Sequence, residues 1–89
     1  MNVKMPIAVE LDLEARAAYV RYSTAPVDRT IAVLPSAIVA ADLDRDGDVV
    51  GIELLRIDDA AVVFLAKHFA AQRELAFPPH VDGRSLEGP

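Results

Sequence analysis

The chain has 89 residues, a formal net charge of −5 and no cysteine. This length fits one domain, and the lack of cysteine excludes disulfides, thiolate zinc sites and cysteine nucleophiles. The nine basic residues are scattered, whereas seven of the fourteen acidic residues lie between Asp42 and Asp59. Binding along a nucleic-acid backbone needs clustered Lys and Arg, so we expect no nucleic-acid partner.

The sequence also predicts a cytoplasmic protein that does not enter a membrane. The first residues, "MNVKMPIAVELD", lack the apolar core of a secretory signal. The longest apolar run, "AAVVFLA" at 60–66, is far shorter than the ~20 residues that span a bilayer. Only His68 and His80 offer imidazole groups, so we expect no histidine metal cluster and no cofactor.

Five segments have the pattern of β-strands. Alternating apolar residues predict a strand at 7–13, with Ile7, Val9 and Leu11 on one half-buried face. Aromatic and β-branched residues predict strands at 18–23, 29–33, 37–43 and 48–57, with a turn at 35–36. Both faces of the fifth segment are largely apolar, so we expect it to be covered on both sides.

The period then changes to that of a helix. Asp58 is a suitable N-cap, and helix formers without Gly or Pro continue to Leu75. One apolar stripe is predicted to lie on the sheet and contains Val62, Leu65, Ala66 and Phe69. A second stripe on roughly the opposite side contains Phe64, His68, Ala71 and Leu75.

Together these elements predict an α+β fold, an antiparallel β-meander of about five strands with one C-terminal helix packed on the sheet. The single domain is expected to span residues 1–76. Residues 77–89 are rich in Pro and Gly and predict an extended or disordered tail.

The stretch "DLDRDGDVVGIE" at 42–53 matches the EF-hand calcium loop at every position. Its ligands would be Asp42, Asp44, Asp46, Asp48 and Glu53. An EF-hand needs a helix on each side, but Pro35 interrupts the preceding segment and two valines and a glycine follow the loop. The same residues fit a β-hairpin in which Gly47 has a left-handed backbone. We therefore favour the hairpin and keep weak calcium binding as an alternative.

The succession "VELDLEARAAYVRYS", "VDRT" and "AADLDRDGDVVGIELL" resembles a small bacterial family known as domain of unknown function 2283. The similarity covers about residues 7–57, and its most specific part is "DxDxxGxxxGIE". The resemblance implies a β-meander with a helix and no established activity. Because some relatives look like the antitoxin half of two-gene modules, it also implies a protein partner, which for this acidic chain would be a small basic protein.

A cluster of polar residues is predicted on one sheet face, formed by Tyr19, Arg21 and Glu53. Arg21 and Glu53 fit a cross-strand or intersubunit ion pair. A glycine inside a strand often marks the close approach of a ring, and at Gly51 the ring of Tyr19 would be sufficient reason. His68, a lone histidine without an obvious nucleophile, fits a packing residue better than a general base.

These patterns favour a non-catalytic interaction module over an enzyme, because no convergent acid, base and oxyanion groups are legible. Calcium binding is the second hypothesis, and a small enzyme of unknown reaction is the third. We expect a homodimer, because the second helix stripe and the outer side of the fifth strand need an apolar partner. The predicted interface consists of Phe64, His68, Ala71, Leu75, Val49 and Leu55.

Overall fold

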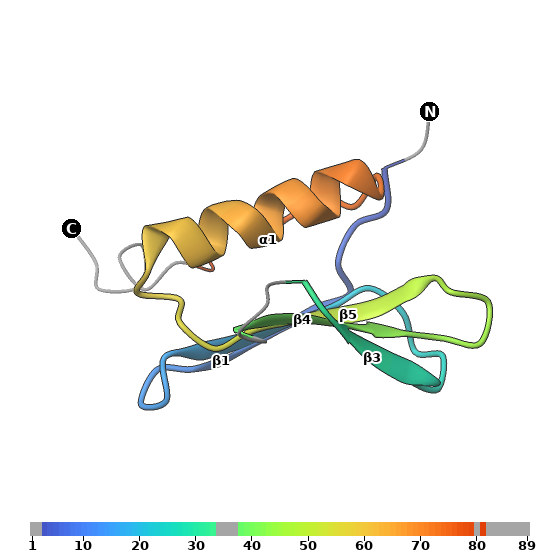
Figure 1. Ribbon diagram of the computed structural model, residues 1–89, viewed down its shortest axis with the longest axis horizontal. Helices are drawn as coiled ribbons and strands as arrows, with labels where there is room; N and C mark the ends of the chain where they lie inside the picture. Colours follow the sequence, from blue (N-terminus) through green and yellow to red (C-terminus); the bar gives the residue numbers. More distant parts are fainter. Residues whose placement is uncertain (1–2, 34–37, 80, 82–89) are drawn as a thin grey trace.

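The computed structural model describes residues 3–33, 38–79 and 81. In these residues the chain forms one antiparallel sheet with a helix across one of its faces (Figure 1). The strands are β1 (Ala8–Asp12), β2 (Ala17–Arg21), β3 (Arg29–Ala32), β4 (Val39–Leu43) and β5 (Val49–Leu54), and the helix is α1 (Ala60–Gln72). The predicted α+β class is therefore confirmed. The turn predicted at 35–36 lies outside the described residues.

The strands follow the order β1-β2-β5-β4-β3, and every neighbouring pair is antiparallel. The sheet thus joins the β1-β2 hairpin to a β3-β4-β5 meander. β5, the last of the described strands, is central because it pairs with both β2 and β4. All of its residues except Glu53 are buried, as the apolar character of both faces predicted.

A bulge in the β4-β5 hairpin decides which side of the sheet Val49 faces. Asp42 pairs with Gly51, whereas Leu43 pairs with Val49, so β5 contains one extra residue at this point. Simple alternation along β5 would place Val49 on the outer side together with Gly51. The extra residue moves Val49 into the core cluster that also contains Leu43, where it is only 5% exposed. This corrects its expected place on an outer apolar surface.

The core lies between α1 and the sheet, and α1 packs over β4 and β5. Three residues of the predicted sheet-facing stripe are buried, whereas Leu65 is half-buried. The buried helix residues are Val62, Val63, Ala66, Phe69 and Ala70. In the described part of the chain, no helix has the length and apolar character needed to cross a membrane.

The helix begins later than predicted. Its N-cap is Asp59, whose side chain accepts a hydrogen bond from the backbone N–H of Ala61 at 2.9 Å. Asp58 instead accepts a hydrogen bond from the guanidinium of Arg16 at 2.8 Å. That hydrogen bond holds the pKa of the Asp58 carboxyl below its usual value. The prediction of Asp58 as the N-cap is therefore wrong.

The helix ends at Gln72, before the predicted end at Leu75. Glu74 has a left-handed backbone with φ 58°, and the N–H of Leu75 bonds to the carbonyl of Ala70 at 2.9 Å. Leu75 then forms a bridge with Lys4 and is 8% exposed. Leu75 thus belongs to the core and not to an outer stripe. After Val49, it is the second residue of the predicted interface that the structure corrects.

The chain beyond the helix also contributes to the core. The buried Tyr22 donates a hydrogen bond from its hydroxyl to the carbonyl of Ala76 at 2.7 Å. Phe77 packs against the core, and Val81 is buried in it. The core therefore extends beyond the predicted boundary at residue 76. The rest of the predicted tail, residues 80 and 82–89, lies outside the described residues.

Asp59→Ala is expected to lower the free energy of unfolding by about 1 kcal/mol, because the first turn of α1 loses its capping acceptor. Asp59→Asn should cost less, since Asn is also a good N-cap. Urea denaturation followed by circular dichroism measures both changes. Asp58→Ala gives the comparison and should cost less than Asp59→Ala, because it removes only solvent-screened ion pairs with Arg16 and Arg56. Wild-type stability in Asp59→Ala would contradict the cap.

Candidate functional site

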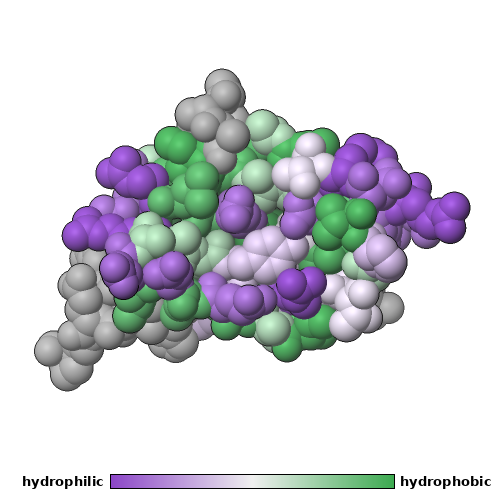
Figure 2. All heavy atoms as spheres, turned by 90° about the horizontal axis from the view of Figure 1, so that it is seen from below, coloured by the Kyte–Doolittle hydropathy of each residue, from purple (hydrophilic) through white to green (hydrophobic). Residues whose placement is uncertain are grey.

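Polar side chains gather on the sheet face away from α1. Figure 2 shows this face, on which hydrophilic side chains cross the middle and hydrophobic ones lie beside them. The strand register places Tyr19 opposite Glu53 and Arg21 opposite Gly51. Because alternate strand residues share a face, Tyr19, Arg21 and Glu53 lie on one face as predicted.

Asp42 is the centre of a hydrogen-bond network on this open face. One carboxylate oxygen, Oδ2, accepts from the Tyr19 hydroxyl at 2.8 Å, and the other, Oδ1, accepts from the Thr30 hydroxyl at 2.6 Å. The three side chains come from β4, β2 and β3. Since β5 lies between β2 and β4, Tyr19 reaches across β5 to Asp42. The network therefore connects the two halves of the sheet.

Gly51 makes this crossing sterically feasible. A Cβ atom at Gly51 would collide with the ring and hydroxyl oxygen of Tyr19. Gly51 pairs with Arg21 on one side and with Asp42 on the other, so it lies on the path from β2 to Asp42. The predicted approach of Tyr19 to this glycine is confirmed.

The Tyr19 phenol is held in its protonated form. Burial raises its pKa to about 12, with further contributions from the hydrogen bond and the charge of Asp42. At neutral pH the phenol is therefore a hydrogen-bond donor. The stabilisation linked to this raised pKa is complete below pH 10, the ordinary pKa of tyrosine, and is lost as the pH rises through about 12.

Arg21 completes the polar cluster but not with the predicted ion partner. Its guanidinium carbon lies 5.1 Å from the ring centroid of Tyr19, a cation–π distance. Its ion pair is with Glu10 on β1, with 3.7 Å between Nη2 and Oε2. Among the described residues, the predicted cross-strand pairing of Arg21 with Glu53 is replaced by this contact with the strand on the other side of β2.

The predicted calcium loop forms a tight turn. The N–H of Asp44 bonds to the carbonyl of Asp48 at 2.9 Å, and the N–H of Gly47 bonds to the carbonyl of Asp44 at 3.0 Å. Gly47 has φ 86°, the left-handed backbone that the hairpin interpretation predicted. The Asp44 carboxylate accepts from the N–H groups of Asp46 at 2.9 Å and Asp48 at 3.0 Å. The hairpin is confirmed, and Asp44 is its turn-forming residue.

Only three of the five suggested calcium ligands lie together. Carboxylate oxygens of Asp44, Asp46 and Asp48 are within 4.8 Å of one another. Asp42 is bonded to Tyr19 and Thr30 instead. Glu53 lies on β5 opposite Ala40, about 16 Å along an extended strand from Asp48. The five side chains therefore do not converge as they do in an EF-hand.

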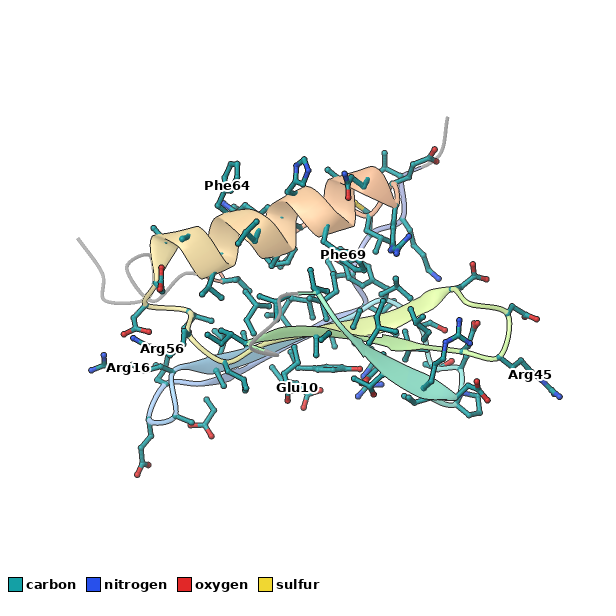
Figure 3. The ribbon with its side chains drawn as sticks, in the orientation of Figure 1. Glu10, Arg16, Arg45, Arg56, Phe64 and Phe69 are labelled. Atoms are coloured by element: carbon teal, nitrogen blue, oxygen red, sulfur yellow. The ribbon has the colours of Figure 1, made fainter. Side chains whose placement is uncertain are left out.

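The predicted interface residues divide into exposed and buried groups. Phe64 is 66% exposed and points away from the sheet, whereas Phe69 points toward it (Figure 3). The exposed His68 stacks on Phe64, with ring centroids 6.4 Å apart. Ala71 is exposed, and Leu55 is 44% exposed. Val49 and Leu75 are buried within the chain, as described above.

A larger exposed apolar surface lies in the first thirteen residues. Six of the nine exposed large hydrophobic residues in the described ranges occupy alternate positions there, namely Val3, Met5, Ile7, Val9, Leu11 and Leu13. The sequence predicted that Ile7, Val9 and Leu11 share a half-buried face. They are exposed because α1 packs over β4 and β5, whereas β1 is at the sheet edge. We call Ile7, Val9 and Leu11 the β1 apolar row.

An acidic hollow of about 240 Å³ opens on the other face near the same edge. Its polar lining residues are Glu10, Asp12, Tyr19 and Glu53, so three carboxylates surround one phenol. The hollow lies where β1, β2 and β5 are neighbours. Such a surface favours a positively charged ligand group.

Comparison of the chain with protein-family models, curated proteins and solved structures finds no match. The resemblance to domain of unknown function 2283 stays a prediction.

Gly51→Ala is expected to lower the free energy of unfolding by about 1–3 kcal/mol, because the new methyl group displaces Tyr19 from Asp42. Urea denaturation measures the loss. In a Tyr22→Phe background Tyr19 is the only tyrosine, and absorbance then reports its pKa. We expect this pKa to fall from about 12 toward 10 in Gly51→Ala.

Tyr19→Ala provides the background that separates this collision from a general intolerance of alanine in β5. In the Tyr19→Ala background, Gly51→Ala should lower the free energy of unfolding much less than it does in the wild type. Equal losses in both backgrounds would contradict the role given to Tyr19.

Asp44→Ala is expected to lower the free energy of unfolding by about 1 kcal/mol, because two turn N–H groups lose an acceptor. Asp44→Asn retains a side-chain oxygen and should be close to wild type. Thermal unfolding measured with EDTA and with millimolar calcium should give the same ranking. A calcium-dependent rise in the wild-type melting temperature that Asp44→Ala abolishes would favour the calcium interpretation instead.

Proposed function

We propose that the chain is a non-catalytic protein-interaction module that self-associates as a homodimer. The observation that carries this proposal is the run of exposed apolar side chains at alternate positions from Val3 to Leu13. In a strand, alternate residues point to the same face, so Val9 and Leu11 of β1 lie on one face, with the exposed Ile7 and Leu13 directly before and after the strand. A contiguous apolar strip of this kind is characteristic of a surface that another protein covers.

Burial of this strip is favourable in proportion to the apolar area removed from water. At about 25 cal/mol per Å², covering several half-exposed aliphatic side chains contributes a few kcal/mol. The chain has only 89 residues, so its own core gives a modest margin of stability. Association would therefore add stability as well as cover the strip.

The polar cluster supports a structural role more than a catalytic one. Asp42 accepts two hydrogen bonds, and Tyr19 keeps its proton with a pKa of about 12. A general base needs a pKa near the working pH, and a phenol at 12 is far from it. Tyr19 and Asp42 connect strands, and the Tyr19 phenol is not matched to acid–base catalysis at neutral pH.

The acidic hollow supports a further partner, a small basic protein. Glu10, Asp12 and Glu53 place three carboxylates around one depression, and the chain carries a formal charge of −5. Complementary charge accelerates encounter and selects partners of opposite sign. An antitoxin-like role, as the resemblance to domain of unknown function 2283 implies, is consistent with such a partner.

Light scattering at tens of micromolar protein is expected to give the mass of two chains, twice 9.6 kDa. The reason is that none of the described residues covers the exposed apolar strip, which a second copy would cover. Dilution toward nanomolar concentration should shift the mass toward one chain, because association depends on protomer concentration. A mass of one chain at tens of micromolar would contradict self-association.

A further inference from the structure

We infer that the homodimer forms by antiparallel pairing of β1 with β1 of a second copy, which extends the sheet across a two-fold axis. This inference rests on the proposed self-association and specifies its surface. An edge strand presents unpaired backbone N–H and C=O groups, and a second strand satisfies them. The pairing also places the β1 apolar row beside the same row of the second copy, which buries part of both.

β1 is better suited to this pairing than the opposite edge strand. Every residue of β1 is exposed. In the β1 apolar row, the exposed fractions are 56% for Ile7, 40% for Val9 and 38% for Leu11. β3 is shorter, and its apolar Ile31 is half-buried against the core cluster. Charged side chains protect edges from unwanted pairing. On β1 they are confined to the open face, at Glu10 and Asp12.

The outer face of α1 is a weaker candidate. Phe64 is its large exposed hydrophobic residue, and one of its neighbours on that face is the ring of His68. Two of the residues predicted to extend this surface, Val49 and Leu75, are already buried in the core. The helix face therefore offers one aromatic anchor, whereas β1 offers an apolar row and one edge that pairs with no other strand of the described residues.

Charge selects the register of the pairing. A two-fold axis perpendicular to the sheet places one residue of β1 opposite its own copy. Centring on Glu10 opposes two glutamates, centring on Leu11 opposes Glu10 to Asp12, and centring on Asp12 opposes two aspartates. Like charges directly opposite each other destabilise a sheet. Centring on Ala8 would require Lys4 to pair, but its backbone already bonds to Glu74 and Ala76.

The remaining register is centred on Val9. On the helix side, Val9 then lies beside the second copy's Val9, and Ile7 lies beside the second copy's Leu11, so the apolar rows contact each other. On the open face, Ala8 faces the second copy's Glu10. Arg21 lies opposite Ala8 on β2. The small Ala8 side chain therefore separates Arg21 from the second copy's Glu10, which places opposite charges on either side of it.

Val9→Lys tests the surface, because it places two ammonium groups at the axis. We expect light scattering to show one chain's mass under conditions in which the wild type gives two. Val27→Lys is the matched control, since Val27 is an exposed valine outside the strands, at 49% against 40% for Val9. It should leave the dimer intact. Circular dichroism should show an unchanged fold in both variants, because each site is solvent-accessible.

Single cysteines test the register, since the chain has none of its own. Directly opposed residues in an antiparallel pair have Cα atoms about 4.5–5.5 Å apart, within disulfide range. Val9→Cys should therefore give a disulfide-linked dimer under mild oxidation. Leu11→Cys should not, because the two copies of residue 11 lie about 14 Å apart in this register.

The outcomes separate this inference from the proposed function. A wild type that is monomeric at tens of micromolar overturns both. A wild-type dimer that Val9→Lys leaves intact overturns the β1 pairing alone. In that case, dissociation of Phe64→Asp would assign the interface to the outer face of α1. Faster cross-linking of Leu11→Cys than of Val9→Cys would overturn the register, whereas the expected pattern supports both surface and register.

Discussion

The sheet depends on covering its central strand, β5, on both faces. On one face α1 and the core residues exclude water, so Ile52 and Leu54 are fully buried. On the other face there is no second layer of secondary structure in the described residues, and Tyr19 lies over Gly51 instead. The phenol then ends at Asp42, which gives its polar end a partner. One aromatic side chain thus replaces a covering element.

The local elements follow from local patterns. Alternation and the change to a helical period predicted five strands and one helix, because side-chain direction repeats every two residues in a strand and every 3.6 in a helix. No such repeat in the sequence predicts the order of the strands, since the neighbours β2 and β5 are distant in the sequence. Val49 and Leu75 differ from expectation for related reasons. The bulge in the β4-β5 hairpin interrupts the two-residue period at Val49. The left-handed backbone of Glu74 ends the helical period just before Leu75.

The candidate site was predictable in part. The shared face of Tyr19, Arg21 and Glu53 follows from alternation, and the need for a glycine follows from a ring above it. The role of Asp42 was missed because the calcium-loop pattern accounted for it as a ligand. Its bonds to Tyr19 and Thr30 depend on β2 and β3 flanking the β4-β5 pair. Contacts across a sheet require the strand order, which the sequence pattern does not contain.

The size of one helix leaves the β1 apolar row uncovered. An α-helix with its side chains is about 10 Å wide, whereas five strands spaced about 4.8 Å apart span roughly twice that width. A single helix therefore covers about two strands. The short connection from β5 returns α1 over β5 and β4, and β1 at the edge lies beyond its reach. Ile7, Val9 and Leu11 would need a second layer of their own chain or a neighbouring strand. In the proposed dimer, a second copy paired at β1 would supply that strand and place an identical apolar row beside them.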